Sequence, residues 1–155
     1  MLRVFGLTAV LGVYLIATAA WADQESGFTP NEEDAQMLVM KAVDAYDVSG
    51  EDAFAAMSGP GNEYHRGSLY VFIIGRDERV LVQAADQGRV GADNRLSIDA
   101  DGIAMPPLLR KTATPDGAWV HYRWAHPVTT KPTPKKSWVV LHDGLIFGAG
   151  IYSKP

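Results

Sequence analysis

The chain contains no cysteine among its 155 residues. This absence excludes a disulfide framework, a thiolate metal site and a cysteine nucleophile. The common catalytic signatures are also missing, since the sequence has no G-x-S-x-G, H-E-x-x-H, phosphate-loop or dinucleotide-binding pattern. We therefore expect that the protein is not an enzyme. Paired carboxylates in a long polar loop at residues 84–104 are the alternative basis for catalysis, and the sequence does not define their geometry.

Basic clusters are lacking as well. The formal net charge is −4 at pH 7, and the charges are spread along the chain. Such a chain is not expected to bind nucleic acid or anionic lipid as its main partner. Hydrophobic residues make up 47% of the sequence and charged residues 21%, which is typical of one globular domain.

The first 22 residues have the pattern of a secretory signal peptide. A positive charge at Arg3 is followed by an uncharged, mostly apolar run, and the small residues Ala20 and Ala22 suit a signal peptidase. The alternative is an uncleaved anchor, because the 19 residues from Val4 to Ala22 are just long enough to span a bilayer. No second apolar run of that length follows. We therefore expect no membrane span after cleavage, and a periplasmic or secreted protein.

Capping residues and helical spacing predict one long helix near the start of the mature chain. Asn31 is a good N-cap, and acidic residues occupy the first turn, where the helix dipole favours them. An apolar stripe at helical spacing then extends to about Val48, and Gly50 is the expected C-terminal cap. Shorter helices are predicted at residues 51–57 and 107–111.

Five segments have the composition of strands. The segment at 118–125, AWVHYRWA, is the richest in aromatic and imidazole rings. Asp143-Gly144 suits a two-residue hairpin turn. A long helix on one face of a five-stranded antiparallel sheet, with short connecting helices, is an α+β fold. The predicted strands are residues 68–74, 79–83, 118–125, 136–142 and 145–152.

Five short motifs follow one another along the chain. They are Gly67 to Ile74 (GSLYVFII), Arg79 to Val82 (RVLV), Asp99 to Gly102 (DADG), Gly117 to Trp124 (GAWVHYRW) followed by Pro127, and Lys135 to Val140 (KKSWVV) with Gly148 to Tyr152 (GAGIY). In this order they resemble the motifs of a single Cache domain, the PAS-like extracellular sensor module of bacterial chemoreceptors and sensor kinases. The resemblance covers residues 30–153, which we take as one ligand-binding domain. It implies a PAS-like α+β fold and a sensory, chemotaxis-related function in signal transduction.

The chain departs from the family pattern in three respects. Gln83 stands where the family often has a histidine, and Trp138 stands where it has a tyrosine. The flanking transmembrane helices and the cytoplasmic signalling domain are missing. We therefore expect the domain to act alone or to dock onto a membrane sensor or transporter protein.

Four residues on two neighbouring strands form the core of the candidate ligand-binding site. Tyr122 and Trp124 share one face of their strand, and Lys136 and Trp138 share one face of the next, because strand side chains alternate. If the two faces coincide, the ammonium group of Lys136 lies among three rings. Such a pocket suits a small carboxylate.

Tyr70 and Phe72 are expected to complete the wall of this pocket from the first hairpin. The resemblance implies that the ligand is a small organic molecule, commonly an acid, an amino acid or an amine, bound on the sheet face under a long loop. A carboxylate is favoured, and no cofactor is expected. In the alternative interpretation the rings form an ordinary core and Lys136 extends to solvent, in a structural or adaptor module without a small ligand.

A metal site is not expected. His121 and His126 are five residues apart and fall on opposite strand faces by parity. Residues 97–102 resemble the start of a calcium-binding loop, but the position that requires glutamate is Leu108. A turn and a helix cap account better for these aspartates.

Overall fold

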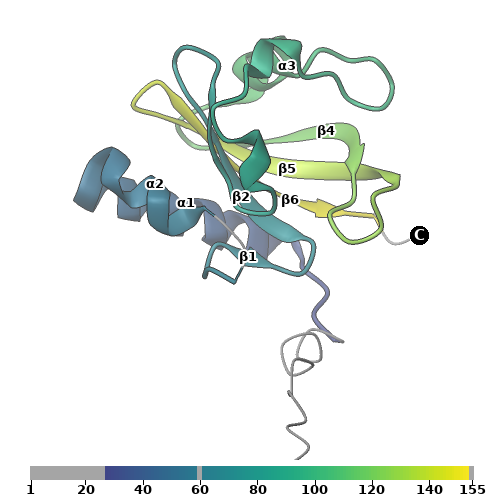
Figure 1. The fold of residues 1–155 in the computed structure, drawn as a ribbon, viewed down its shortest axis with the longest axis horizontal. Coiled ribbons are helices and arrows are strands. Elements are labelled where there is room, and N and C mark those ends of the chain that lie inside the picture. Colours follow the sequence, from purple (N-terminus) through teal and green to yellow (C-terminus); the bar gives the residue numbers. More distant parts are fainter. Residues whose placement is uncertain (1–26, 59–60, 154–155) are drawn as a thin grey trace, which may run out of the picture.

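The structure is a computed structural model that describes residues 27–58 and 61–153 (Figure 1). The predicted signal peptide, residues 1–22, lies outside the described residues. No helix in the described part of the chain is long and apolar enough to cross a membrane. The helices are α1 (Glu32–Ser49), η1 (Gly50–Asp52), α2 (Ala53–Met57), η2 (Gln87–Arg89), η3 (Asn94–Leu96) and α3 (Met105–Thr112). The strands are β1 (His65–Arg66), β2 (Leu69–Ile74), β3 (Val80–Gln83), β4 (Ala118–Ala125), β5 (Pro132–His142) and β6 (Leu145–Tyr152).

The ends of α1 lie where the sequence predicts them. The Asn31 side chain accepts a hydrogen bond from the backbone N–H of Asp34, and the Asp34 side chain accepts one from the N–H of Asn31. This reciprocal capping box satisfies two N–H groups at the N-terminal end of the helix. Gly50 ends α1 with a φ of 59°, which glycine adopts at least cost. The predicted helix from Asn31 to about Val48 is confirmed.

The sheet is antiparallel and has the order β1-β2-β6-β5-β4, with β3 also paired to β2. The five predicted strands are present, and the two-residue β1 is additional. The α+β class and the PAS-like arrangement of a long helix on such a sheet are therefore confirmed.

β5 begins earlier than expected, at Pro132 rather than Lys136. Pro134 pairs with Arg123 of β4, but pairing of β5 with β6 starts only at Lys135, opposite Tyr152. The first residues of β5 thus form a ladder with β4 only, and the Pro134 carbonyl accepts a hydrogen bond from the N–H of Ser153, just beyond β6. A proline is tolerated there because its missing N–H removes no bond between the two strands.

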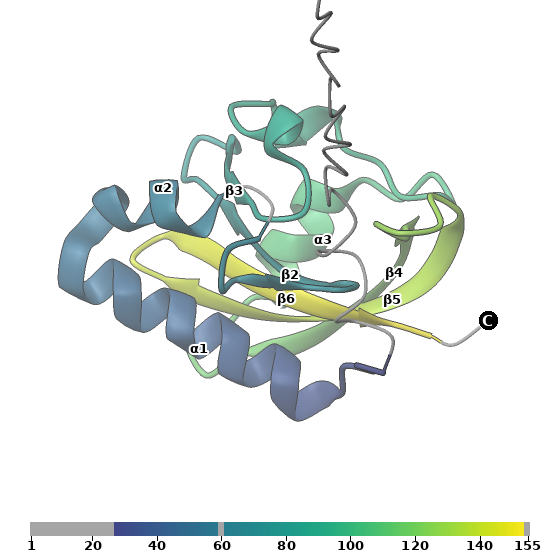
Figure 2. The same cartoon turned by 60° about the horizontal axis from the view of Figure 1, so that its bottom comes forward.

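The sheet is covered on both faces (Figure 2). α1 lies along one face, where Tyr46 packs edge-on against Phe147 of β6 with ring centroids 5.6 Å apart. α3 and the connection at residues 84–104 lie over the other face. Both faces are therefore apolar, and the core has two layers of side chains.

Aspartates organise the long connection between β3 and α3. Asp86 and Asp93 accept hydrogen bonds at the starts of η2 and η3. Asp99 is 6% exposed, so its carboxylate needs partners within the protein. The backbone N–H groups of Asp101, Ile103 and Arg123 donate hydrogen bonds to the Asp99 carboxylate. Because Arg123 belongs to β4, the third of these bonds attaches the loop to the sheet.

Candidate ligand-binding site

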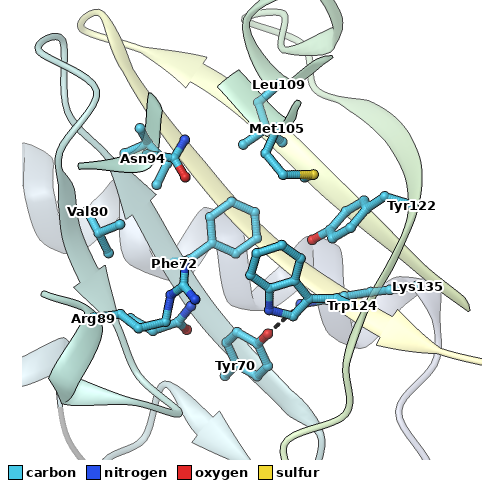
Figure 3. Close-up of a pocket in the computed structure, with 12 residues that line it drawn as sticks. Tyr70, Phe72, Val80, Arg89, Asn94, Met105, Leu109, Tyr122, Trp124 and Lys135 are labelled. Carbon is cyan, nitrogen blue, oxygen red and sulfur yellow. Dashed lines mark hydrogen bonds between the residues drawn. The ribbon is translucent and has the colours of Figure 1, made fainter. Parts of the chain in front are cut away.

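A small cavity of about 40 Å³ lies between the sheet and the covering loop with α3 (Figure 3). Its floor comes from β2, β3, β4 and β5, and its roof from residues 89–109. Strand alternation brings every second side chain of β2 and β4 to this face. The lining residues are Tyr70, Phe72, Ile74, Val80, Gln83, Arg89, Asn94, Met105, Leu109, Tyr122, Trp124 and Lys135.

Lys135 is the unusual member of this lining, because it is a cation that is only 3% exposed. Its Nζ atom donates a hydrogen bond to the Tyr70 hydroxyl over 2.8 Å. The same atom lies 4.0 Å from the ring centroid of Tyr70 and 4.9 Å from that of Tyr152. No carboxylate of the described residues lies within ion-pair distance of it. Burial without an anion holds the pKa of Lys135 well below its usual range.

The hydrogen bonds around Lys135 form a chain with a defined direction. Tyr152 donates to the carbonyl of Ala125 over 3.0 Å, so its oxygen is free to accept. Tyr70 lies 3.1 Å from Tyr152 and therefore donates to it while accepting from the ammonium of Lys135. Burial raises the pKa of both phenols, which keeps their protons in place. The ammonium group is thus held in one position, and its other N–H donors have no acceptor among the described residues.

Two glycines of β6 make room for this arrangement. Gly148 pairs with Phe72, and a side chain at Gly148 would overlap the Phe72 ring. Gly150 pairs with Ser137, and a side chain at Gly150 would overlap Ser137 and the stem of Lys135. The G-A-G sequence at residues 148–150 therefore permits a phenyl ring and a lysine to lie flat against the strand.

The structure places Lys136 and Trp138 on the other face of the sheet, contrary to our expectation. The register pairs Tyr122 with Lys135, and His121 with Lys136. Lys136 accordingly forms an ion pair with Glu32 at the start of α1. Lys135 therefore occupies the position that the sequence interpretation assigned to Lys136.

Trp138 is likewise turned away from the cavity. Its ring packs edge-on against Trp119 with centroids 5.3 Å apart, and it fills the space beside Gly117. Gly117 has a φ of 81°, and a side chain there would overlap the Trp138 ring. Trp138 thus supports the α1 side of the sheet.

Four expected residues do lie together in the cavity lining: Tyr70, Phe72, Tyr122 and Trp124. Tyr122 and Trp124 contact each other edge-on, with centroids 6.1 Å apart. Tyr122 also shares a hydrogen bond of 2.9 Å with the buried Ser137, and burial raises its pKa. The rings therefore form the walls that the sequence suggested.

Comparison with solved structures finds similar domains of about the same length. A methyl-accepting chemotaxis protein from Vibrio parahaemolyticus is 17% identical, with a TM-score of 0.59, over 77% of this chain and 86% of its own. A Cache chemosensory domain described for carboxylic acid recognition is 21% identical, with a TM-score of 0.56, over 79% of this chain and 92% of its own. The fold is that of a Cache domain. A periplasmic sensor domain of a chemotaxis protein is 20% identical, with a TM-score of 0.53, over 79% of this chain and 90% of its own. No family model and no curated protein matches the sequence.

Two buried amides of this Cache fold have atoms without a hydrogen-bond partner in the part of the chain that the structure describes. They are Oε1 of Gln83, on a residue 8% exposed, and Nδ2 of Asn94, on a residue 5% exposed. Both residues line the cavity. In the sequence, Gln83 is marked only by its departure from the family pattern, and no motif points to Asn94. Because buried polar atoms normally have partners, each of these two atoms is a candidate contact for a bound molecule.

Arg89 is a second cation at the cavity that the sequence did not indicate. Its guanidinium lies over the ring of Trp124, 5.1 Å from the centroid, and donates to the hydroxyl of Ser97. Arg89 and Trp124 also line a neighbouring surface groove of about 290 Å³, as do Tyr70 and Gln83. These four residues therefore separate the inner cavity from an opening to solvent.

Metal-binding groups do not gather in this site. No cluster of three or more histidine, aspartate or glutamate side chains with metal-binding geometry is found within residues 27–58 and 61–153. His126 instead packs against Tyr152 with ring centroids 4.7 Å apart. Burial and the charge of Lys135 lower the pKa of His126, which favours its neutral form.

Proposed function

We propose that this protein is an exported, periplasmic or secreted sensor domain that binds a small carboxylate on Lys135. The observation that carries the proposal is a buried ammonium group without a counter-ion in the described structure. Burial of an unpaired charge costs free energy, and a bound anion offsets that cost. A carboxylate supplies both the charge and the acceptor oxygens that Lys135 lacks.

The size of the cavity limits the ligand to a few heavy atoms. Its volume of about 40 Å³ is roughly three times that needed for one buried water molecule. The rings of Phe72 and Trp124 would contact the short apolar part of such a ligand, while its carboxylate accepts hydrogen bonds from the ammonium group of Lys135. Acids of two or three carbons suit this space best.

Similarity to other proteins supports this choice of ligand class. One structural neighbour is a Cache chemosensory domain described for carboxylic acid recognition. The related domains belong to chemotaxis proteins, which are sensory, and this supports a protein that binds its ligand without transforming it. A membrane sensor or transporter would then receive the signal by docking.

The second candidate function is an adaptor module whose cavity holds no ligand. The two functions differ in whether an anion binds to Lys135. In an adaptor without a ligand, nothing would offset the free-energy cost of burying this charge. In a cavity that never holds a ligand, Oε1 of Gln83 would also stay without a hydrogen-bond donor, and nothing would offset the cost of burying it. The ligand-binding function is therefore preferred.

The experiment compares two neighbouring lysines. Acetate and propionate are titrated into the mature protein by calorimetry, and thermal unfolding is followed in parallel. A ligand present at 100 times its dissociation constant should stabilise the wild type by about 2.7 kcal/mol. Lys135→Met should lose this response, while Lys136→Met should retain it because Lys136 faces α1.

Two results would overturn the proposal. One is the absence of binding by any short carboxylate to the wild-type protein. The other is equal binding by wild type and Lys135→Met, which would place the anion elsewhere. Loss of binding in Lys136→Met with retention in Lys135→Met would restore the assignment that the sequence alone suggested.

A further inference from the structure

Gln83 indicates which kind of carboxylic acid the cavity would prefer. Its Oε1 atom is a buried hydrogen-bond acceptor with no partner, and it faces the cavity. A plain carboxylate on Lys135 would leave this oxygen unpaired, because a carboxylate and a hydrocarbon tail have no hydrogen to donate. A ligand that also carries a donor group would satisfy it.

Gln83 lies within reach of a molecule bound at Lys135. Gln83 of β3 pairs directly with Phe72 of β2, so their side chains are neighbours on the same face. The Nζ atom of Lys135 lies 5.7 Å from the centroid of that same Phe72 ring and 4.0 Å from that of Tyr70. Gln83 and Lys135 thus both border the Phe72 ring, and both line the same small cavity.

The second unpaired atom, Nδ2 of Asn94, has a different position. Figure 3 shows Asn94 and Lys135 on opposite sides of Phe72, with Asn94 toward Val80. The Phe72 ring therefore lies between Asn94 and a short acid held by Lys135. Asn94 provides a control position, since it is equally buried and equally unpaired.

We propose that Gln83 recognises the substituent on the second carbon of the acid, so that the site prefers a short 2-hydroxy acid. This inference rests on the proposed carboxylate-binding function and names the class of acid. A hydroxyl group donates to Oε1 of Gln83, while the carboxylate accepts from the ammonium group of Lys135.

Other substituents at the same carbon fit less well. A 2-oxo group has no hydrogen to donate, so Gln83 remains unpaired. A 2-ammonium group has hydrogens, but the described lining contains two cations, Lys135 and Arg89, and no carboxylate. The positive charge of an amino acid would therefore be repelled.

The test uses four three-carbon acids that differ only at the second carbon: propionate, lactate, pyruvate and alanine. Dissociation constants are measured by calorimetry with the mature protein, using both enantiomers of lactate and alanine. The better lactate enantiomer should bind about tenfold more tightly than propionate. Pyruvate should bind about as tightly as propionate, and alanine should bind most weakly.

Variants at Gln83 and Asn94 assign the preference to a residue. Gln83→Met keeps the side-chain length and removes the amide, so the affinity ratio of lactate to propionate should fall to about one while propionate still binds. Propionate binding serves here as the measure of an intact fold. Asn94→Leu should keep the preference for lactate.

The outcomes separate this inference from the proposed function. If none of the four acids binds, carboxylate binding itself is wrong. If propionate binds and lactate binds no more tightly, the carboxylate site stands and the role of Gln83 is wrong. If Asn94→Leu rather than Gln83→Met removes the preference, the assignment to Gln83 is overturned.

Discussion

Replacing Lys135 with methionine should make the unliganded protein more stable. The change removes an ammonium group that is 3% exposed and has no carboxylate partner among the described residues. Methionine has nearly the same length and adds no polar atom, so the cost in packing should stay below about 1.5 kcal/mol. The hydroxyl of Tyr70 keeps its bond to Tyr152. The desolvation cost of the charge is the larger quantity.

The magnitude follows from the burial of the charge. Desolvation of a buried ion costs several kcal/mol even after relaxation, and apolar replacements of buried charges are often stabilising by about 1–4 kcal/mol. For a domain of this size 1 kcal/mol moves the melting temperature by roughly 3–6 °C. We expect Lys135→Met to raise it by about 5–10 °C. Lys136→Met is the matched control, because its ion pair with Glu32 is partly exposed and should be worth at most about 1 kcal/mol.

The difference in unfolding free energy between Lys135→Met and the wild type should also depend on pH. Burial lowers the pKa of Lys135 in the folded state, so the folded protein releases this proton before the unfolded chain does. As pH rises through the folded-state pKa toward the usual value near 10.4, the wild type gains stability relative to Lys135→Met. The difference should be greatest at low pH and should narrow in alkaline solution.

Urea unfolding in buffers free of carboxylates measures both effects, with near-neutral and alkaline samples compared. A Lys135→Met variant less stable than wild type by more than about 1 kcal/mol would refute the reasoning, since packing would then outweigh desolvation. A stability difference that stays constant with pH would show that burial does not lower the pKa of Lys135 in the folded state.

Two further predictions concern the supports of the site. Gly150→Ala should destabilise the fold by about 1–3 kcal/mol and weaken acetate binding, because the added methyl group would overlap Ser137 and the stem of Lys135. Urea unfolding and calorimetry measure the two effects. Gly27→Ala is the control in both experiments, because a side chain at Gly27 meets open space. Asp99→Ala should cost about 2–4 kcal/mol at neutral pH, because three backbone N–H groups lose their acceptor. Burial raises the pKa of Asp99, but these hydrogen bonds outweigh it and hold the pKa below its usual range. The stabilisation by Asp99 is therefore complete above about pH 4 and is lost as pH falls through the folded-state pKa; an equal difference between wild type and Asp99→Ala in urea at pH 7 and at strongly acidic pH would contradict this.

Local signals in the sequence were sufficient to predict most of the secondary structure. Asn31 and Gly50 marked the ends of α1 because capping depends on neighbouring backbone groups. The hairpin turn at Asp143-Gly144 was predictable because positive φ angles favour such residues, and both residues have them. The class of the fold followed from one long helix and five strands in this order.

The sequence also determined which rings would be near one another, since Tyr122 and Trp124 are two residues apart on one strand. It could not determine which of two adjacent lysines would join them. Shifting the pairing of a strand by one residue moves all its side chains to the other face. In most antiparallel sheets a polar outer face reveals the register, but here α1 covers one face and the loop with α3 covers the other. Both faces of β5 are therefore covered, and each carries one of the two lysines, so the pattern KKSWVV fits either assignment.

The tertiary structure decided that question through the pairing of Tyr122 with Lys135 and through Gly150, which leaves space for the stem of Lys135. It also decided that Gln83 and Asn94 face a cavity without partners, which depends on packing between distant segments. The sequence by itself thus determined the elements, the fold class and the aromatic walls, because these follow from short-range periodicity. Only the folded chain determined that Lys135 is the cation between the aromatic walls, because register and burial depend on contacts between strands.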